Sequence, residues 1–395
     1  FAAVLFITPR LLGVRLVGER MAWGAMALWN LGVISLVAVA YLPSLAADGA
    51  HALLGLPIPG LLLLAMLNVN AAFWRTLLAS GERVPYVSIW FFGLGLLAFM
   101  GAYALGAAAQ AGAYFINLDA TAVALVDGFV ERMIATYWVL GIALGTLFYV
   151  VPRATLNALS SGGMAFLSWL LWAGLSGISG LAALADPSVP FFVTTLGHVG
   201  TMLLVAPVFL AVATLATTMR GSWTEAFVPG TLGFALVAIA FLLVTALLQA
   251  IGALRSVQML VHGTEWATGA TMFASLGAAT FAFFAFAEHA APRVFRRDWR
   301  GSLLTDAQLW LTFAGVMLTG VALVAAGVVH GSLMRDGAPP EVVSGTLQWF
   351  RLVAAGGLGM VALGGVCGVL TLFLIYTTAR RAEYVLDDAV AAAGH

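Results

Sequence analysis

The sequence has few charges, a single cysteine and no lysine. Charged residues make up 9% of the 395 positions and hydrophobic residues 62%, far from the composition of a soluble domain. All 17 basic residues are arginine, and 17 acidic residues balance them, so the composition argues against a nucleic-acid partner. One cysteine, Cys367, excludes a disulfide framework and a thiolate metal cluster. We therefore expect an all-α polytopic membrane protein.

The chain also begins without methionine, and its first apolar run stops at Arg10. A membrane span takes about 20 apolar residues, so this run is too short to cross a bilayer. We expect that upstream sequence, containing at least one helix, precedes Phe1. A cleaved signal peptide is less favoured because a basic segment follows the run.

Ten long apolar segments follow the opening fragment, and each is long enough to span a membrane. They cover residues 22–46, 58–80, 86–110, 132–152, 160–185, 191–219, 227–252, 264–288, 305–333 and 348–378. Their alternation places 13 of the 17 arginines on one side, and this asymmetry predicts that the arginine-rich loops and the C-terminus are cytoplasmic. The remaining arginines, on or near the outer side, are Arg132, Arg255, Arg335 and Arg351.

The segments predict one transmembrane helical domain over residues 1–395, ending in a short cytoplasmic tail at 382–395. Proline- and serine-rich linkers that could separate two domains are absent from the sequence. It also lacks an inverted repeat of the kind that many transporters contain.

Ionisable residues are scarce within the apolar segments, which argues against a proton pump or an ion-coupled transporter. The histidines have no i, i+4 spacing of the kind that builds a metal site on one helix. His51, His198, His262 and His330 map to the outer side, His289 to the inner side, and His395 ends the chain. We favour dispersed interfacial histidines over a cluster around a metal or haem propionates.

Residues 171–180 read LWAGLSGISG, a run of small residues inside an apolar segment. Small residues let membrane helices approach closely. The run therefore indicates a place where two helices pack together, or a place where a helix leaves room for another group.

Several motifs, taken in order, resemble the catalytic subunit of cbb3-type cytochrome c oxidases, in the haem-copper oxidase superfamily. They are VPYVSIWFFG (84–93), FYVVPR (148–153), LLWAG (170–174), TLGHVGTMLLVAP (195–207), GSW (221–223), HGTEWATG (262–269) and PRVF (292–295). The resemblance implies a bundle of about 12 transmembrane helices, of which about ten complete helices and one partial helix fall in this chain. It also implies other membrane subunits and lipid as partners, and a bacterial inner membrane as the location.

The resemblance further implies histidine ligands for copper and two haems. Transferred position by position, those ligands fall on other residue types. The copper ligands fall on Arg132, Ser176 and Gly177, the reactive tyrosine on Leu170, the high-spin haem ligand on Ala270 and a low-spin haem ligand on Met272. The second low-spin ligand would lie upstream of Phe1. Alanine, glycine and leucine cannot coordinate a metal, and an arginine would repel copper.

We therefore expect a degenerate subunit, without catalysis of its own, that serves as a scaffold or accessory subunit of a respiratory or electron-transfer complex. No cofactor is expected under this hypothesis. A second hypothesis retains one haem b, with Met272 as an axial ligand, or a quinone. A third is a transporter or channel through the vacated cavity, lined by Thr214, Thr217, Thr218, Thr245 and Gln249.

Overall fold

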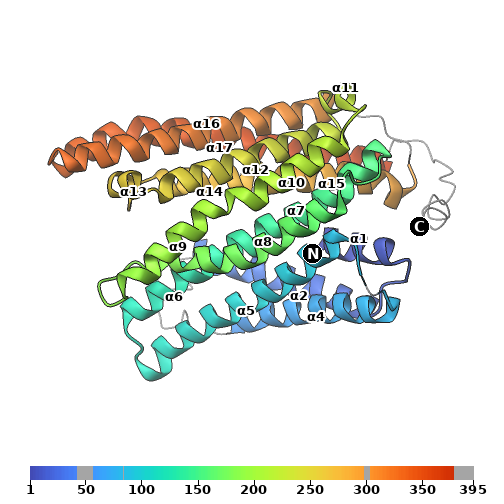
Figure 1. The fold of residues 1–395 in the computed structure, drawn as a ribbon, viewed down its shortest axis with the longest axis horizontal. Helices are drawn as coiled ribbons and strands as arrows, with labels where there is room; N and C mark the ends of the chain where they lie inside the picture. Colours follow the sequence, from blue (N-terminus) through green and yellow to red (C-terminus); the bar gives the residue numbers. More distant parts are fainter. Residues whose placement is uncertain (42–56, 83, 298–302, 378–395) are drawn as a thin grey trace. The chain divides into compact units, whose positions relative to one another are not determined.

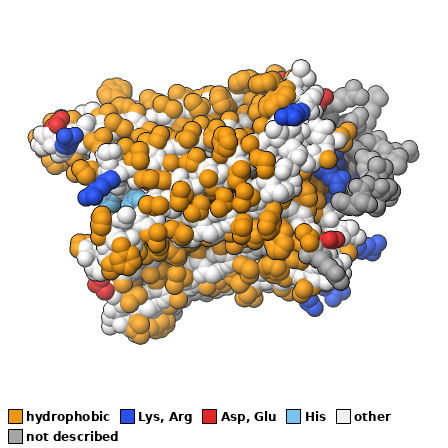
Figure 2. Space-filling view, viewed as in Figure 1, with side chains coloured by type: hydrophobic (Ala, Val, Ile, Leu, Met, Phe, Trp, Pro, Cys, Tyr) orange, Lys and Arg blue, Asp and Glu red, His pale blue; other side chains and the backbone are white. Residues whose placement is uncertain are grey.

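The computed structural model describes residues 1–41, 57–82, 84–297 and 303–377. This part of the chain contains ten helices that are long and apolar enough to cross a membrane. The predicted all-helical, multi-span architecture is thereby confirmed (Figure 1). On the face drawn in Figure 2, hydrophobic side chains cover the flanks of the helices and charged side chains lie near helix ends. That distribution is the one expected of helices surrounded by lipid.

The chain forms two compact units, which are described separately. The first comprises Phe1–Ile142 and Ala183–Thr194. Its helices are α1 (Ala2–Leu12), α2 (Glu19–Tyr41), α4 (Pro57–Ser80), α5 (Val87–Ile116), α6 (Ala120–Met133) and the π-helix η2 (Ile134–Leu140). Helix α2 packs on α4, and α5 packs on α6 and η2.

Aromatic side chains fill part of the first unit. Phe99 stacks on Trp138, with ring centroids 4.5 Å apart and an interplanar angle of 11°. Phe1 lies 5.0 Å from Trp138 and 4.9 Å from Trp29. Such pairs add to the free energy of simple area burial, so Trp138 has a packing role here.

The second unit comprises Ala143–Ala182 and the chain from Thr195 onward. Its elements are α7 (Gly141–Thr155), α8 (Gly162–Gly180), η3 (Leu181–Ala183), α9 (Phe191–Leu203), α10 (Val205–Thr218), α11 (Trp223–Ala226), α12 (Thr231–Ala253), α13 (Arg255–Val261), α14 (Trp266–Met272), the π-helix η4 (Phe273–Ala279), α15 (Thr280–Phe295), α16 (Leu303–Arg335) and α17 (Pro340–Thr377). Helices α7, η3 and α9 each straddle the boundary between the units. Helices α16 and α17 run side by side (Figure 1) and share the most extensive contact in the unit.

The helix that contains the predicted segment 132–152 begins earlier than the apolar pattern indicates. In the structure the span runs from Ala120 to Thr155. Asp119 caps its start, because its carboxylate accepts a hydrogen bond of 3.1 Å from the Thr121 backbone N–H. Asp127 and Glu131 interrupt the apolar run without ending the helix, since both are exposed.

Two predictions about domain organisation remain: a single domain over residues 1–395 and a short tail at 382–395. The two units do not test whether residues 1–395 form one domain, so that stays a prediction. The tail at 382–395 lies outside the described residues, as do His51 and His395.

Candidate functional site

Helix α8 carries three of the positions that the family resemblance singles out. Ser161 caps the start of the helix, because its hydroxyl accepts a hydrogen bond from the Met164 backbone N–H. Ser168, Trp172 and Ser176 recur every four residues on its buried face. Leu170 is 51% exposed, so the structure places the tyrosine position on a different face of α8 from Ser176.

The small-residue run at 171–180 includes Gly174, but the close packing of α8 involves other glycines. A Cβ added at Gly174 would meet nothing within 4 Å, so this glycine is not at a helix contact. The close approach comes from α9, where a Cβ at Gly200 would lie 2.7 Å from Ile178 Cγ2 and 3.0 Å from the Ser179 N. Gly197 approaches the backbone of Leu181 and Ala182 in the same way. Small residues on α9, and not Gly174, therefore let this pair of segments meet.

Ser176 is fully buried, and its hydroxyl has no hydrogen-bond partner. One turn away, the indole Nε1 of Trp172 is also buried and unpartnered. Gly177 follows Ser176 and contributes no side chain. One hydroxyl and one indole N–H do not provide the imidazole nitrogens that copper takes from a protein, so these residues do not fit a copper centre.

Two serines on this face allow a matched test. Ser168 Oγ donates a hydrogen bond of 2.8 Å to the Pro207 carbonyl on α10, whereas Ser176 Oγ is unpartnered. We expect Ser168→Ala to lower the free energy of unfolding by about 1 kcal/mol, because it leaves a buried carbonyl without a donor. Ser176→Ala is expected to leave stability unchanged or to raise it. Thermal unfolding in detergent micelles measures both, and an equal loss in the two variants would show that Ser176 has a partner.

The predicted haem-ligand positions lie at the α14–η4 junction. Ala270 is buried, and Met272 is the half-buried last residue of α14. Next to Ala270, a Cβ at Gly269 would lie 2.8 Å from Val324 Cγ2 and 3.1 Å from the Gly320 carbonyl oxygen. Helix α14 therefore rests directly on α16 at this level. Of the two positions, only Met272 has an atom able to coordinate a haem iron.

Arg132 belongs to the first unit and lies in the last turn of α6. Its backbone carbonyl accepts a hydrogen bond of 2.8 Å from Thr136 Oγ1, and the π-helix η2 begins at Ile134. The second π-helix, η4, likewise begins directly after Met272. Wide π-turns are rare and often occur at functional sites. Neither π-helix is visible in the sequence, because the residues of a π-turn have no distinctive composition.

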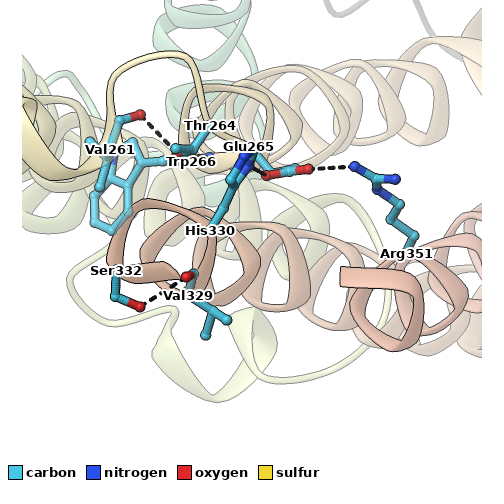
Figure 3. A network of polar contacts seen from close by, with 8 residues as sticks. All are labelled: Val261, Thr264, Glu265, Trp266, Val329, His330, Ser332 and Arg351. Carbon is cyan, nitrogen blue, oxygen red and sulfur yellow. Dashed lines mark hydrogen bonds and ion pairs between the residues drawn. The ribbon is translucent and has the colours of Figure 1, made fainter. Parts of the chain in front are cut away.

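A three-residue polar network joins α14, α16 and α17 (Figure 3). One carboxylate oxygen of Glu265 lies 2.7 Å from His330 Nδ1, and the other accepts a hydrogen bond of 2.9 Å from Arg351. Burial alone would raise the pKa of Glu265, but the hydrogen bonds from Arg351 and His330 outweigh it and hold this pKa below its ordinary value. The sequence places His330 and Arg351 on or near the outer side but pairs neither with Glu265, which lies 65 and 86 positions before them in the chain.

Two other described histidines, His262 and His289, lie in separate surroundings. His262 Nδ1 is 3.2 Å from Gln258 Nε2 on the exposed side of α13. His289 is buried, with its ring edge-on to Tyr149 at a centroid distance of 5.8 Å. Within the ranges that the structure describes, no three His, Cys, Asp or Glu side chains gather in a way that could hold a metal ion.

The chain matches one family model and is similar to two curated proteins along most of its length. The family model described as cytochrome C and quinol oxidase polypeptide I matches residues 1–360. The chain is 23% identical to the cbb3-type cytochrome c oxidase subunit CcoN1 of Stutzerimonas stutzeri, over 85% of this chain and 71% of that protein. It is also 23% identical to cytochrome c oxidase subunit 1 of Rhodobacter capsulatus, over 94% of this chain and 70% of that protein.

A solved structure shares the fold. The chain superposes on a chain of a haem-copper terminal oxidase dimer with a TM-score of 0.75 and 15% sequence identity, covering 94% of this chain and 72% of that one. At this identity the likeness concerns the fold, and it agrees with the helical bundle that the sequence motifs implied.

Proposed function

Because the chain belongs to the cytochrome c and quinol oxidase polypeptide I family, we propose that it is a divergent subunit I that keeps the membrane fold without an oxygen-reducing metal centre. The family assignment and the multi-span fold establish a haem-copper oxidase subunit I-like membrane protein. The loss of the metal centre is the proposed part. One observation carries it: buried Ser176 and Ala270, with Gly177, stand where the resemblance requires imidazole ligands.

The role that follows is that of a scaffold or accessory subunit in a respiratory or electron-transfer complex of the bacterial inner membrane. Two curated relatives are named as oxidase subunits, which supports membrane partners in general. Exposed apolar side chains along α17, among them Leu363, Val366 and Val369, offer a face for lipid or for helices of other subunits. Fold alone does not specify this role.

A second candidate function retains one low-spin haem. Its support is Met272, which is half-buried in the last turn of α14 beside the π-helix η4. A thioether is an accepted axial ligand of cytochromes, although most methionines in apolar helices fill core space. The chain contributes this side chain and no further described ligand at the junction.

The transport hypothesis finds no comparable support. The hydroxyls of Thr214, Thr217 and Thr218 donate to backbone carbonyls within α10, at 2.7 Å in each case. Back-bonded threonines of this kind are ordinary in membrane helices and do not indicate a continuous polar path.

Cofactor analysis of the purified complex tests the proposal. We expect that this chain contributes no haem absorption and binds no copper. The absorption spectrum of Met272→Leu is expected to equal that of the wild type. Selective loss of a haem b band in Met272→Leu would establish the second candidate instead. A full complement of two haems and one copper bound to this chain would contradict the proposed loss of the metal centre.

A further inference from the structure

The Glu265–His330–Arg351 network lies near one end of the membrane-spanning part of α16. Between Asp306 and His330 the helix has 23 residues, at positions 307–329, and none of them is charged. At 1.5 Å per residue this stretch is about 35 Å long, close to the thickness of the hydrocarbon core, about 30 Å. The network is therefore placed at a boundary between hydrocarbon and lipid headgroups.

A shallow, open groove of about 440 Å³ lies on one face of α17 at this level. Its lining residues all belong to the first turns of the helix: Glu341, Ser344, Gly345, Gln348, Arg351 and Leu352. The groove thus begins among polar side chains and ends on an apolar one. Trp349, which is 74% exposed, lies beside it, and exposed tryptophans are typical of the membrane interface.

Arg351 is the cation of this groove. Its side chain is 57% exposed, and Figure 3 shows one guanidinium nitrogen directed at Glu265 and another turned away from it. A guanidinium has five N–H donors in a planar fork, so the bond to Glu265 leaves donors for a second acceptor. Arginine at a membrane interface also reaches toward headgroups while its stem stays in apolar surroundings.

We infer that this groove binds the phosphate of a phospholipid, with Arg351 and Gln348 as donors and the acyl chains along Leu352. The apolar continuation distinguishes a lipid from free phosphate. Beyond Leu352 the same side of α17 carries Gly356 and Gly359, where an added Cβ would meet nothing within 4 Å, followed by exposed Leu363. Glu341, at the far polar end, is suited to the amine of a zwitterionic headgroup. This site does not depend on the proposed function.

The test uses the full-length protein, purified in detergent and delipidated, with phosphatidylethanolamine, phosphatidylglycerol or inorganic phosphate added back. We expect either phospholipid to raise the thermal unfolding temperature and to give a one-lipid adduct in native mass spectrometry. Inorganic phosphate is expected to do neither. Gly345→Leu fills the groove and is expected to abolish both effects, since a Cβ at Gly345 meets nothing within 4 Å and the fold is not disturbed.

Matched variants separate the groove from general lipid contact. Gly365→Leu makes the same change on another side of the same helix, where an added Cβ also meets nothing within 4 Å, and Arg335→Gln removes an arginine at the end of α16 that does not line the groove. Both should keep the lipid adduct, whereas Arg351→Gln should reduce lipid affinity at least tenfold. Equal lipid binding by Gly345→Leu and Gly365→Leu would overturn the proposal, as would an equal response to inorganic phosphate.

Discussion

Replacing Gly357 with leucine is expected to lower the free energy of unfolding by about 3 kcal/mol or more, because there is no space for a side chain between α16 and α17. A Cβ at this position would lie 2.7 Å from the Gly315 carbonyl oxygen and 2.9 Å from the Thr319 backbone N, and it would collide with Thr319 Oγ1. Two of these atoms belong to the backbone of α16, so the whole helix would have to move. Thermal unfolding in detergent micelles measures the loss.

The adjacent residue supplies the control. Gly356 directly precedes Gly357 in the same helix, yet an added Cβ there meets nothing within 4 Å. Gly356→Leu should match or exceed the wild-type stability, since leucine also has a higher helix propensity than glycine. Similar unfolding temperatures for the two variants would mean that α16 and α17 do not pack in the described register.

Replacing Glu265 with glutamine is expected to lower the free energy of unfolding by about 2 kcal/mol at neutral pH. Glu265 is 16% exposed and accepts from both His330 and Arg351. Glutamine keeps the shape but removes the charge, so Arg351 loses its counter-ion and His330 Nδ1 loses a charged hydrogen-bond partner. Because α14, α16 and α17 all meet at this carboxylate, the start of α14 should loosen as well.

The pH dependence of stability gives a second signature of Glu265. Its pKa in the folded protein lies below the ordinary value of 4.5. The stabilisation is therefore present above about 4.5 and is lost as the pH falls through the lowered folded-state pKa. Glu265→Gln should lack this loss, whereas Glu225→Gln, a control on the exposed face of α11, should keep the wild-type profile. A wild-type profile in Glu265→Gln would show that the network does not stabilise the fold.

Much of the fold is predictable because lipid imposes a simple rule on sequence. Each span needs a long apolar run, and such runs located the ten spans in the part of the chain that the structure describes. Their ends were predicted less well, as at Ala120, because exposed charges interrupt the apolar pattern without breaking a helix. The two π-helices could not be anticipated, since hydrogen-bond register depends on packing and not on composition.

Some features of the candidate site could likewise be predicted from the sequence, and others could not. Residue chemistry at Ser176, Gly177 and Ala270 is readable from the sequence once the family motifs are in register. That Leu170 and Ser176 occupy different faces of α8, and that Gly200 rather than Gly174 makes the close helix contact, emerged only from the structure. A glycine looks the same in sequence whether it faces lipid or another backbone.

The sequence by itself determined a multi-span helical membrane protein of the oxidase subunit I family, since apolar length and ordered motifs are local properties of the chain. Tertiary structure alone decided which glycines touch, which serine is unpartnered, and that Glu265, His330 and Arg351 meet. These features depend on contacts between residues far apart along the chain. Their physical basis is the packing of one helix surface against another, which no single segment encodes.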